Sequence, residues 1–299
     1  LNPLLITVDG ADQISYDRNK PRNSVPDTLD AKIVVDAARF LREGEKMQLQ
    51  YAVKNTSRTI GTRISSHIVT KFGMNNDLQS DHLTIKLQGS AGQALGAFAA
   101  PGLKLEVAGE ANDYVGKGLS GGLIVVRPAQ ISPLVASENT IIGNTVLYGA
   151  TNGHLFASGR AGERFSVRNS GAKTVVEGCG SNGCEYMTGG IAVILGTIGA
   201  NFGAGMTGGM AYLYDPEGKT DLMMNMETLV TCRVTVDHWE KELKALVQRH
   251  ANETGSIKAT KILQQWDQEI ESFVQVCPKE MLVHLPEPLT ADIAQSLPA

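Results

Sequence analysis

The residues with the most obvious chemical potential are the four cysteines, all in the later part of the chain. Cys179 and Cys184 have the C-x4-C spacing found in some iron–sulfur and zinc sites. Such a site needs three or four ligands, and neither Cys232 nor Cys277 has a partner at a suitable spacing. Cys184 also occupies a position where two similar segments carry glycine, which favours a small corner or core residue. We therefore expect no metal ligands in this chain.

Histidines and carboxylates form no catalytic pattern either. The six histidines include no pair at i, i+3 or i, i+4, and His250 falls on the apolar stripe of an expected helix, where a packing role is favoured. The region between residues 116 and 209 has few aromatic residues and only four carboxylates, Glu138, Glu163, Glu177 and Glu185. A β-helical enzyme that cleaves carbohydrates would need acids and exposed aromatics along one face. We expect no catalytic residues.

Two glycine clusters match the dinucleotide-binding fingerprint G-x-G-x-x-G. They are Gly116-x-Gly118-x-x-Gly121 and Gly203-x-Gly205-x-x-Gly208. The fingerprint binds a pyrophosphate only where a helix follows the glycines, and here a short apolar run of strand type follows at once. The clusters are better explained as corners, where glycine adopts positive φ. We expect no cofactor-binding residue in this chain, and Gly205 at positive φ.

The same clusters belong to a repeat that organises the chain. Three near-copies of one segment lie at residues 116–122, 184–190 and 203–209, each followed by a short apolar run. The second and third copies are 19 residues apart, and strand-like runs begin at Leu83 and again 20 and 40 residues later. A fixed period near 20 residues is typical of a solenoid.

Glycine supports the same interpretation, because 27 of the 32 glycines fall between residues 89 and 218. Glycine is unfavourable inside helices but suits corners between short strands. The period predicts a mainly β fold, a single-stranded parallel β-helix of roughly seven coils across residues 81–215. The repeat glycines with this structural role are Gly116, Gly118, Gly121, Gly122, Gly189, Gly190, Gly203, Gly205, Gly208 and Gly209.

Helical segments are expected at both ends of this region. Residues 1–26 resemble an extended arm, followed by a helix that ends at Gly44, a strand over 47–53 and a second helix that ends at Gly73. Asp237-x-x-Glu240 predicts a capped helix, and a further helix is expected before Pro278. We predict three parts: an arm and cap (1–80), a glycine-rich β-helix (81–236) and a helical segment with a tail (237–299).

Composition restricts the functional classes. The chain of 299 residues has a net charge of −4 and a pI near 5.9, which argues against nucleic acid and anionic membranes as partners. No apolar run is long enough to span a bilayer. The use of cysteine suits a reducing compartment. Because the chain begins with Leu1, we expect it to be a piece of a longer protein.

The sequence closely resembles the C-terminal GXGXG domain of the glutamate synthase large subunit. The resemblance covers most of the chain and includes the segments 55–61, 89–93, 112–122, 184–190 and 254–256. It implies a right-handed parallel β-helix. It also implies an enzyme that makes two glutamates from glutamine and 2-oxoglutarate, with a glutaminase domain and a synthase domain that carries FMN and an iron–sulfur cluster. None of that machinery matches residues of this chain.

The resemblance therefore implies a non-catalytic structural domain, which holds the glutaminase and FMN-binding synthase domains of the same polypeptide in place. A subunit of another complex, such as the component of formylmethanofuran dehydrogenase that resembles this domain, is the alternative. Arg58 and Arg63 flank a loop between a strand and a helix, and we expect them either to contact a partner domain or to pair locally. The expected location is the cytoplasm, or a plastid in a plant or alga.

Overall fold

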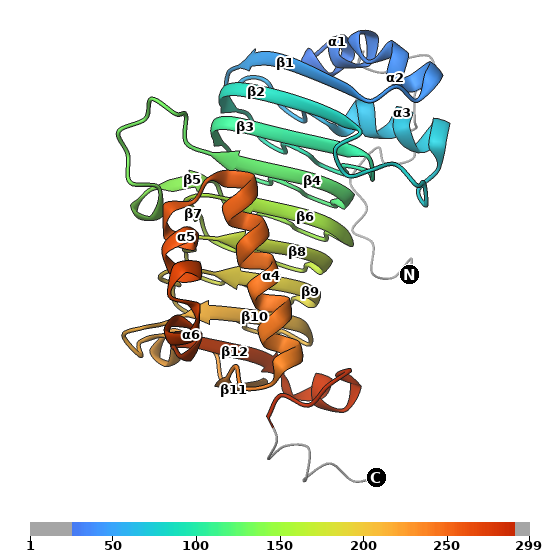
Figure 1. Ribbon diagram of the computed structural model, residues 1–299. Coiled ribbons are helices and arrows are strands. Elements are labelled where there is room, and N and C mark those ends of the chain that lie inside the picture. The colour runs from blue at the N-terminus through green and yellow to red at the C-terminus, as the bar shows by residue number, and fades with distance from the viewer. Residues whose placement is uncertain (1–25, 291–299) are drawn as a thin grey trace, which may run out of the picture.

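The computed structural model describes residues 26–290, so residues 1–25 of the predicted arm lie outside it. The described residues surround one large sheet (Figure 1). The strands are β1 (Met47–Val53), β2 (Leu83–Ala91), β3 (Leu103–Ala111), β4 (Ser120–Arg127), β5 (Thr140–Ile142), β6 (Asn152–Ala157), β7 (Arg160–Ala161), β8 (Ser170–Val176), β9 (Thr188–Ile194), β10 (Gly208–Tyr214), β11 (Leu229–Arg233) and β12 (Phe273–Pro278). The helices are α1 (Leu29–Asp36), α2 (Ala38–Glu43), α3 (Thr62–Phe72), α4 (Asp237–Thr254), α5 (Ile257–Gln264) and α6 (Trp266–Glu269).

The strands pair in the order β1-β2-β3-β4-β6-β8-β9-β10-β12-β11, with β5 and β7 beside this path. From β1 to β10 the pairing is parallel, and the steps seen in the sequence are the register of the sheet. Leu83 lies opposite Leu103, and Lys104 lies opposite Leu123, which are steps of 20 and 19 residues. Between β4 and β6 the step widens to 31 residues, from Leu123 to His154.

The predicted fold class is wrong. We expected a mainly β fold, a single-stranded right-handed parallel β-helix with helices at its two ends. The structure is instead an α/β fold on one twelve-stranded, mostly parallel sheet. In the glycine-rich half of each repeat, residues in the left-handed region interrupt the extended chain, and that half forms tight turns. The 18-residue helix α4 lies across a face of the sheet instead of covering one end (Figure 1).

The core has two layers, one on each face of the sheet. One lies between the sheet and the turns and includes Leu105, Ile124 and Phe165. The other lies between the sheet and the helices α4, α5 and α6, and includes Val125 and Trp239. Strands buried on both faces are apolar throughout, as β4 is, whereas β2 lies beyond α4 and alternates between buried and part-exposed residues.

The predicted elements at the N-terminal end are confirmed. Helix α2 ends at Gly44 with φ of 70°, β1 follows at Met47–Val53, and α3 ends before Gly73. The first helix is divided, since α1 and α2 meet at Ala37. The predicted boundaries at residues 80 and 236 remain a proposal, and the sheet extends across both of them.

The predictions for the C-terminal end are only partly correct. Helix α4 begins at Asp237 as expected, but Val236 is its N-cap and no side chain caps it, so the predicted capping box is wrong. The expected helix before Pro278 ends early, and Phe273–Pro278 is the strand β12, which pairs antiparallel with β10 and β11. Within residues 26–290, no helix has the length and apolar character needed to cross a membrane.

Candidate functional site

The glycine-rich turns build three parallel rows of residues in the left-handed backbone region, which we call the turn ladder. Each of its turns contributes three such residues at alternate positions. The first row contains Ala94, Tyr114, Thr145, Arg164, Asn182 and Asn201; the middle row contains Gly96, Gly116, Leu147, Ser166, Cys184 and Gly203; the third row contains Phe98, Gly118, Gly149, Arg168, Tyr186 and Gly205. Hydrogen bonds between successive turns hold the rows together, as from the N–H of Phe98 to the carbonyl of Lys117 at 2.8 Å.

Two of the repeat glycines are required both for their conformation and for space. Gly118 and Gly205 both have φ of 63°, which confirms the positive φ predicted for Gly205. A Cβ on Gly118 would lie 2.5 Å from Cε1 of Phe98, and one on Gly205 would lie 2.5 Å from Cδ1 of Tyr186. Each glycine therefore lies under an aromatic ring from the turn that stacks against it. Both rings are about half exposed, at 56% for Phe98 and 54% for Tyr186.

The other repeat glycines lie where the turns lead into strands. They form the first residues of β4, β9 and β10, and each lies close to the neighbouring chain. A Cβ on Gly122 would lie 2.8 Å from Cβ of Ala99, and one on Gly209 would lie 2.7 Å from Cε of Met187. The members of this group are Gly121, Gly122, Gly189, Gly190, Gly208 and Gly209. The repeat glycines thus let adjacent chains approach closely.

The cysteines lie in the core. Cys184 occupies the middle row of the turn ladder with φ of 56°, the position that glycine holds in two other turns, as the sequence predicted. Cys179 and Cys184 are both buried, and burial raises the pKa of the Cys179 thiol to about 12 and that of Cys184 well above its ordinary value. Within residues 26–290, no group of three or more His, Cys, Asp or Glu residues is placed to hold a metal ion.

The loop between β1 and α3 carries both predicted contact residues. Arg58 is exposed, and its side chain has no ion pair with any residue of the described chain. Arg63 is half-buried, and its Nη1 lies 3.8 Å from Oδ1 of Asp27. The buried carboxylate of Asp30 fixes the loop, because it accepts hydrogen bonds from the backbone N–H groups of Gly61 at 2.9 Å and Arg63 at 2.5 Å. The local pairing that we expected therefore applies to Arg63 and not to Arg58.

This loop also ends the turn ladder. The N–H of Thr59 donates to the carbonyl of Gln93, and the N–H of Gly96 donates to the carbonyl of Ile60. Arg58 therefore projects from the rigid end of a stack, next to β1. The fold brings Arg58 and Arg63 to this one end, while the repeat glycines extend along the whole ladder.

A buried polar cluster lies where α4 and α5 meet the sheet. The carboxylate of Glu177, just after β8, accepts hydrogen bonds from the hydroxyls of Ser158 at 3.1 Å and Ser256. Nε2 of His250 lies 3.6 Å from Oε1 of the same carboxylate, beyond hydrogen-bond distance. Burial opposes ionisation of Glu177, but these neighbours outweigh it and lower the pKa of the carboxyl. Burial lowers the pKa of His250, which is therefore neutral.

The cluster connects the helices to the sheet. Ser256 is the N-cap of α5 and accepts from the N–H of Ala259 at 3.0 Å while it donates to Glu177. The packing role predicted for His250 agrees with its complete burial. The cluster itself was not predicted, because its members are far apart in the sequence. The arrangement offers no nucleophile with access to solvent, and we assign it a structural role.

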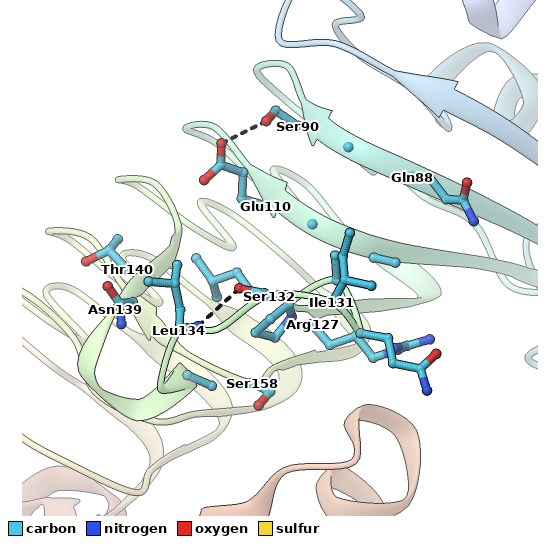
Figure 2. A pocket seen from close by; sticks show the side chains of 18 residues that line it. Gln88, Ser90, Glu110, Arg127, Ile131, Ser132, Leu134, Asn139, Thr140 and Ser158 are labelled. Carbon is cyan, nitrogen blue, oxygen red and sulfur yellow. Dashed lines mark hydrogen bonds between the residues drawn. The ribbon is translucent and has the colours of Figure 1, made fainter.

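The largest feature missed by sequence reasoning is a hollow at the carboxyl ends of β2, β3 and β4 (Figure 2). It has a volume of about 600 Å³ and is bordered by the loop 128–139, which accounts for the 31-residue step after β4. Ile131 and Leu134 on this loop are 95% and 60% exposed. Arg127 forms an ion pair with Glu106 at 3.3 Å. Exposed apolar side chains beside a hollow are typical of a contact surface.

Comparison with known proteins gives a consistent result. The family model described as GXGXG motif matches residues 30–279. The chain is 60% identical over 298 residues to the glutamate synthase [NADPH] large chain of Azospirillum brasilense, covering 98% of this chain and 20% of that protein. It is 45% identical over 266 residues to the glutamate synthase [NADH] of Schizosaccharomyces pombe, covering 89% of this chain and 13% of that protein. It is 49% identical over 228 residues to ferredoxin-dependent glutamate synthase 2 of Synechocystis sp., covering 76% of this chain and 14% of that protein. The chain thus spans a fifth or less of the length of these relatives.

Proposed function

The chain belongs to the GXGXG motif family, and from this we propose that it is a non-catalytic structural domain of a glutamate synthase large chain. One observation carries the proposal: the chain matches a single segment of a protein about five times as long, at 60% identity over nearly its full length. In this proposal the domain holds the glutaminase and FMN-binding synthase domains of the same polypeptide in place. The relatives compared here do not favour a component of formylmethanofuran dehydrogenase.

The electron donors in the relatives' names support a role unrelated to the donor. Proteins named for NADPH, NADH and ferredoxin all contain a segment similar to this chain. A domain shared across three donors is best assigned to what the enzymes have in common. We propose that FMN and the iron–sulfur cluster belong to other domains. We also propose a cytoplasmic location, or a plastid one in a plant or alga, with neither nucleic acid nor membrane as a partner.

The geometry suits a rigid spacer with defined contact points. The turn ladder and the sheet are held by hydrogen bonds at every step, so surface features at different positions are fixed relative to one another. Arg58 projects at one end of the ladder, and Ile131 projects from the loop 128–139. A planar guanidinium can form two parallel hydrogen bonds with a carboxylate of a partner domain.

The test is to replace Arg58 and Arg63 by alanine, separately, in the complete large chain. Each variant should hydrolyse glutamine that is not converted into glutamate, because a displaced domain lets ammonia escape. The ratio of glutamine consumed to glutamate formed measures this loss. Arg42→Ala is a matched control, since Arg42 is also exposed and has no ion pair within residues 26–290. Full coupling in both the Arg58 and Arg63 variants would refute their assignment as contacts between domains.

A further inference from the structure

The sheet has one bare edge, at β1. In a parallel ladder, a residue directs its N–H and its C=O to the same neighbour, and the next residue directs both the other way. Met47 donates its N–H to the carbonyl of His82 at 2.9 Å, so alternate residues from Met47 onward face β2. Gln48, Gln50 and Ala52 therefore face outward. All three are exposed, and their backbone groups have no hydrogen-bond partner within residues 26–290.

The composition of β1 does not protect this edge. Exposed edges are usually blocked by charged residues, proline or a bulge, because unpaired backbone groups attract further strands. The seven residues of β1, Met-Gln-Leu-Gln-Tyr-Ala-Val, include no charge and no proline. At the other end of the sheet, β12 and β11 continue β10 in the antiparallel direction. The asymmetry indicates that something further pairs with β1.

The chain enters the fold beside this edge. The described residues begin at Pro26, immediately before α1, and α1 packs next to β1 (Figure 1). The hydroxyl of Tyr51 in β1 donates to Oδ2 of Asp36 in α1 at 2.7 Å, and the ammonium group of Lys32 lies 5.4 Å from the centre of the Tyr51 ring. The residues that precede Pro26 are therefore tethered close to the bare strand.

We propose that residues 4–8, Leu-Leu-Ile-Thr-Val, add a strand to the open edge of β1. This segment is uncharged and rich in residues that favour strands. Residues 9–25 connect it to Pro26, and an extended chain of that length spans about 55 Å, more than twice the length of β1. The tether gives the segment a high effective concentration at the edge, which a second molecule does not have at ordinary protein concentrations. The added strand would satisfy the outward groups of Gln48, Gln50 and Ala52, and this proposal does not depend on the proposed function.

The test is amide hydrogen exchange, resolved by residue with NMR, on the complete 299-residue chain. Ile6→Pro removes a donor in the middle of the added strand. It should speed the exchange of Gln48, Gln50 and Ala52 by about tenfold or more, which corresponds to a loss of about 1.4 kcal/mol in the free energy of opening. Leu49 and Tyr51, which face β2, should not change and serve as internal references.

Ile14→Pro is the matched control, because it makes the same substitution in the connecting residues 9–25, and it should leave all five amides unchanged. Equal exchange of the three outward amides in Ile6→Pro and the unaltered chain would overturn the proposal. Protection that rises with protein concentration would also overturn it, because it would assign the edge to a second copy of the chain.

Discussion

Replacement of Gly205 by alanine tests the account of the turn ladder most directly. Two costs are expected. The first is conformational, because φ of 63° is unfavourable for a residue with a Cβ by about 1–2 kcal/mol. The second is steric, because the new Cβ would lie 2.5 Å from Cδ1 of Tyr186. Overpacking of this kind costs about 1–3 kcal/mol where the neighbour cannot move.

Gly149 separates the two costs. It holds the same row of the ladder with φ of 65°, but no atom of the described chain lies within 4 Å of a Cβ built there. Gly149→Ala therefore carries only the conformational cost, reduced by about 0.4–1 kcal/mol because alanine restricts the unfolded chain. We expect Gly149→Ala to lose about 1 kcal/mol of stability, and Gly205→Ala to lose about 1–2 kcal/mol more, since the half-exposed Tyr186 ring can partly move away.

Urea unfolding followed by circular dichroism measures both variants, with the midpoint compared at constant slope. The double variant Tyr186→Ala/Gly205→Ala provides the check, because removal of the ring should abolish the steric part. If Gly205→Ala and Gly149→Ala lose the same stability, the ring contact contributes nothing and the reasoning about close approach fails.

Two further predictions concern buried ionisable groups. Burial, with repulsion from Arg249 and Lys173, lowers the pKa of His154 to about 4, so the unfolded chain binds a proton that the folded chain does not. Stability should therefore fall as the pH drops from about 6.5 to 4, by at most about 3 kcal/mol, and His154→Phe should make urea midpoints less dependent on pH in that range; an unchanged dependence would contradict the assignment. Glu177→Leu leaves the hydroxyls of two serines unpaired and should cost about 3 kcal/mol. Amide exchange should then increase first where α4 meets α5, and an unaffected corner would show that the cluster does not hold it.

The repeat was predictable because its cause is local. Glycines and short apolar runs recur at a fixed step, and the register of β2 on β3 reproduces that step. The alignment of Cys184 with glycine positions predicted a corner residue, and its left-handed backbone agrees. The fold class was not predictable in the same way, because nothing in the period distinguishes extended segments from tight turns between the strands of one sheet.

The remaining errors arise from contacts between distant parts of the chain. Phe273 lies on the apolar stripe of an expected helix, yet its segment pairs with β10 and β11, so tertiary pairing overrides the helical pattern. Glu177 was noted only as one of few carboxylates, because its partners Ser158 and Ser256 come from other elements. The wide step after β4 was the available signal for the hollow in Figure 2.

The turn ladder also determines the electrical character of the two ends of the stack. Ala94 and Phe98, in the first and third rows, donate toward the β10 end, whereas Gly116 in the middle row and Ser170 at a strand entrance donate toward the β1 end. The dipoles of these peptide groups therefore oppose one another, unlike those of an α-helix, which add along its axis. A stack of such turns can grow without accumulating partial charge at its ends. What binds an end is then selected by shape and hydrogen bonds, and its affinity should change little with ionic strength.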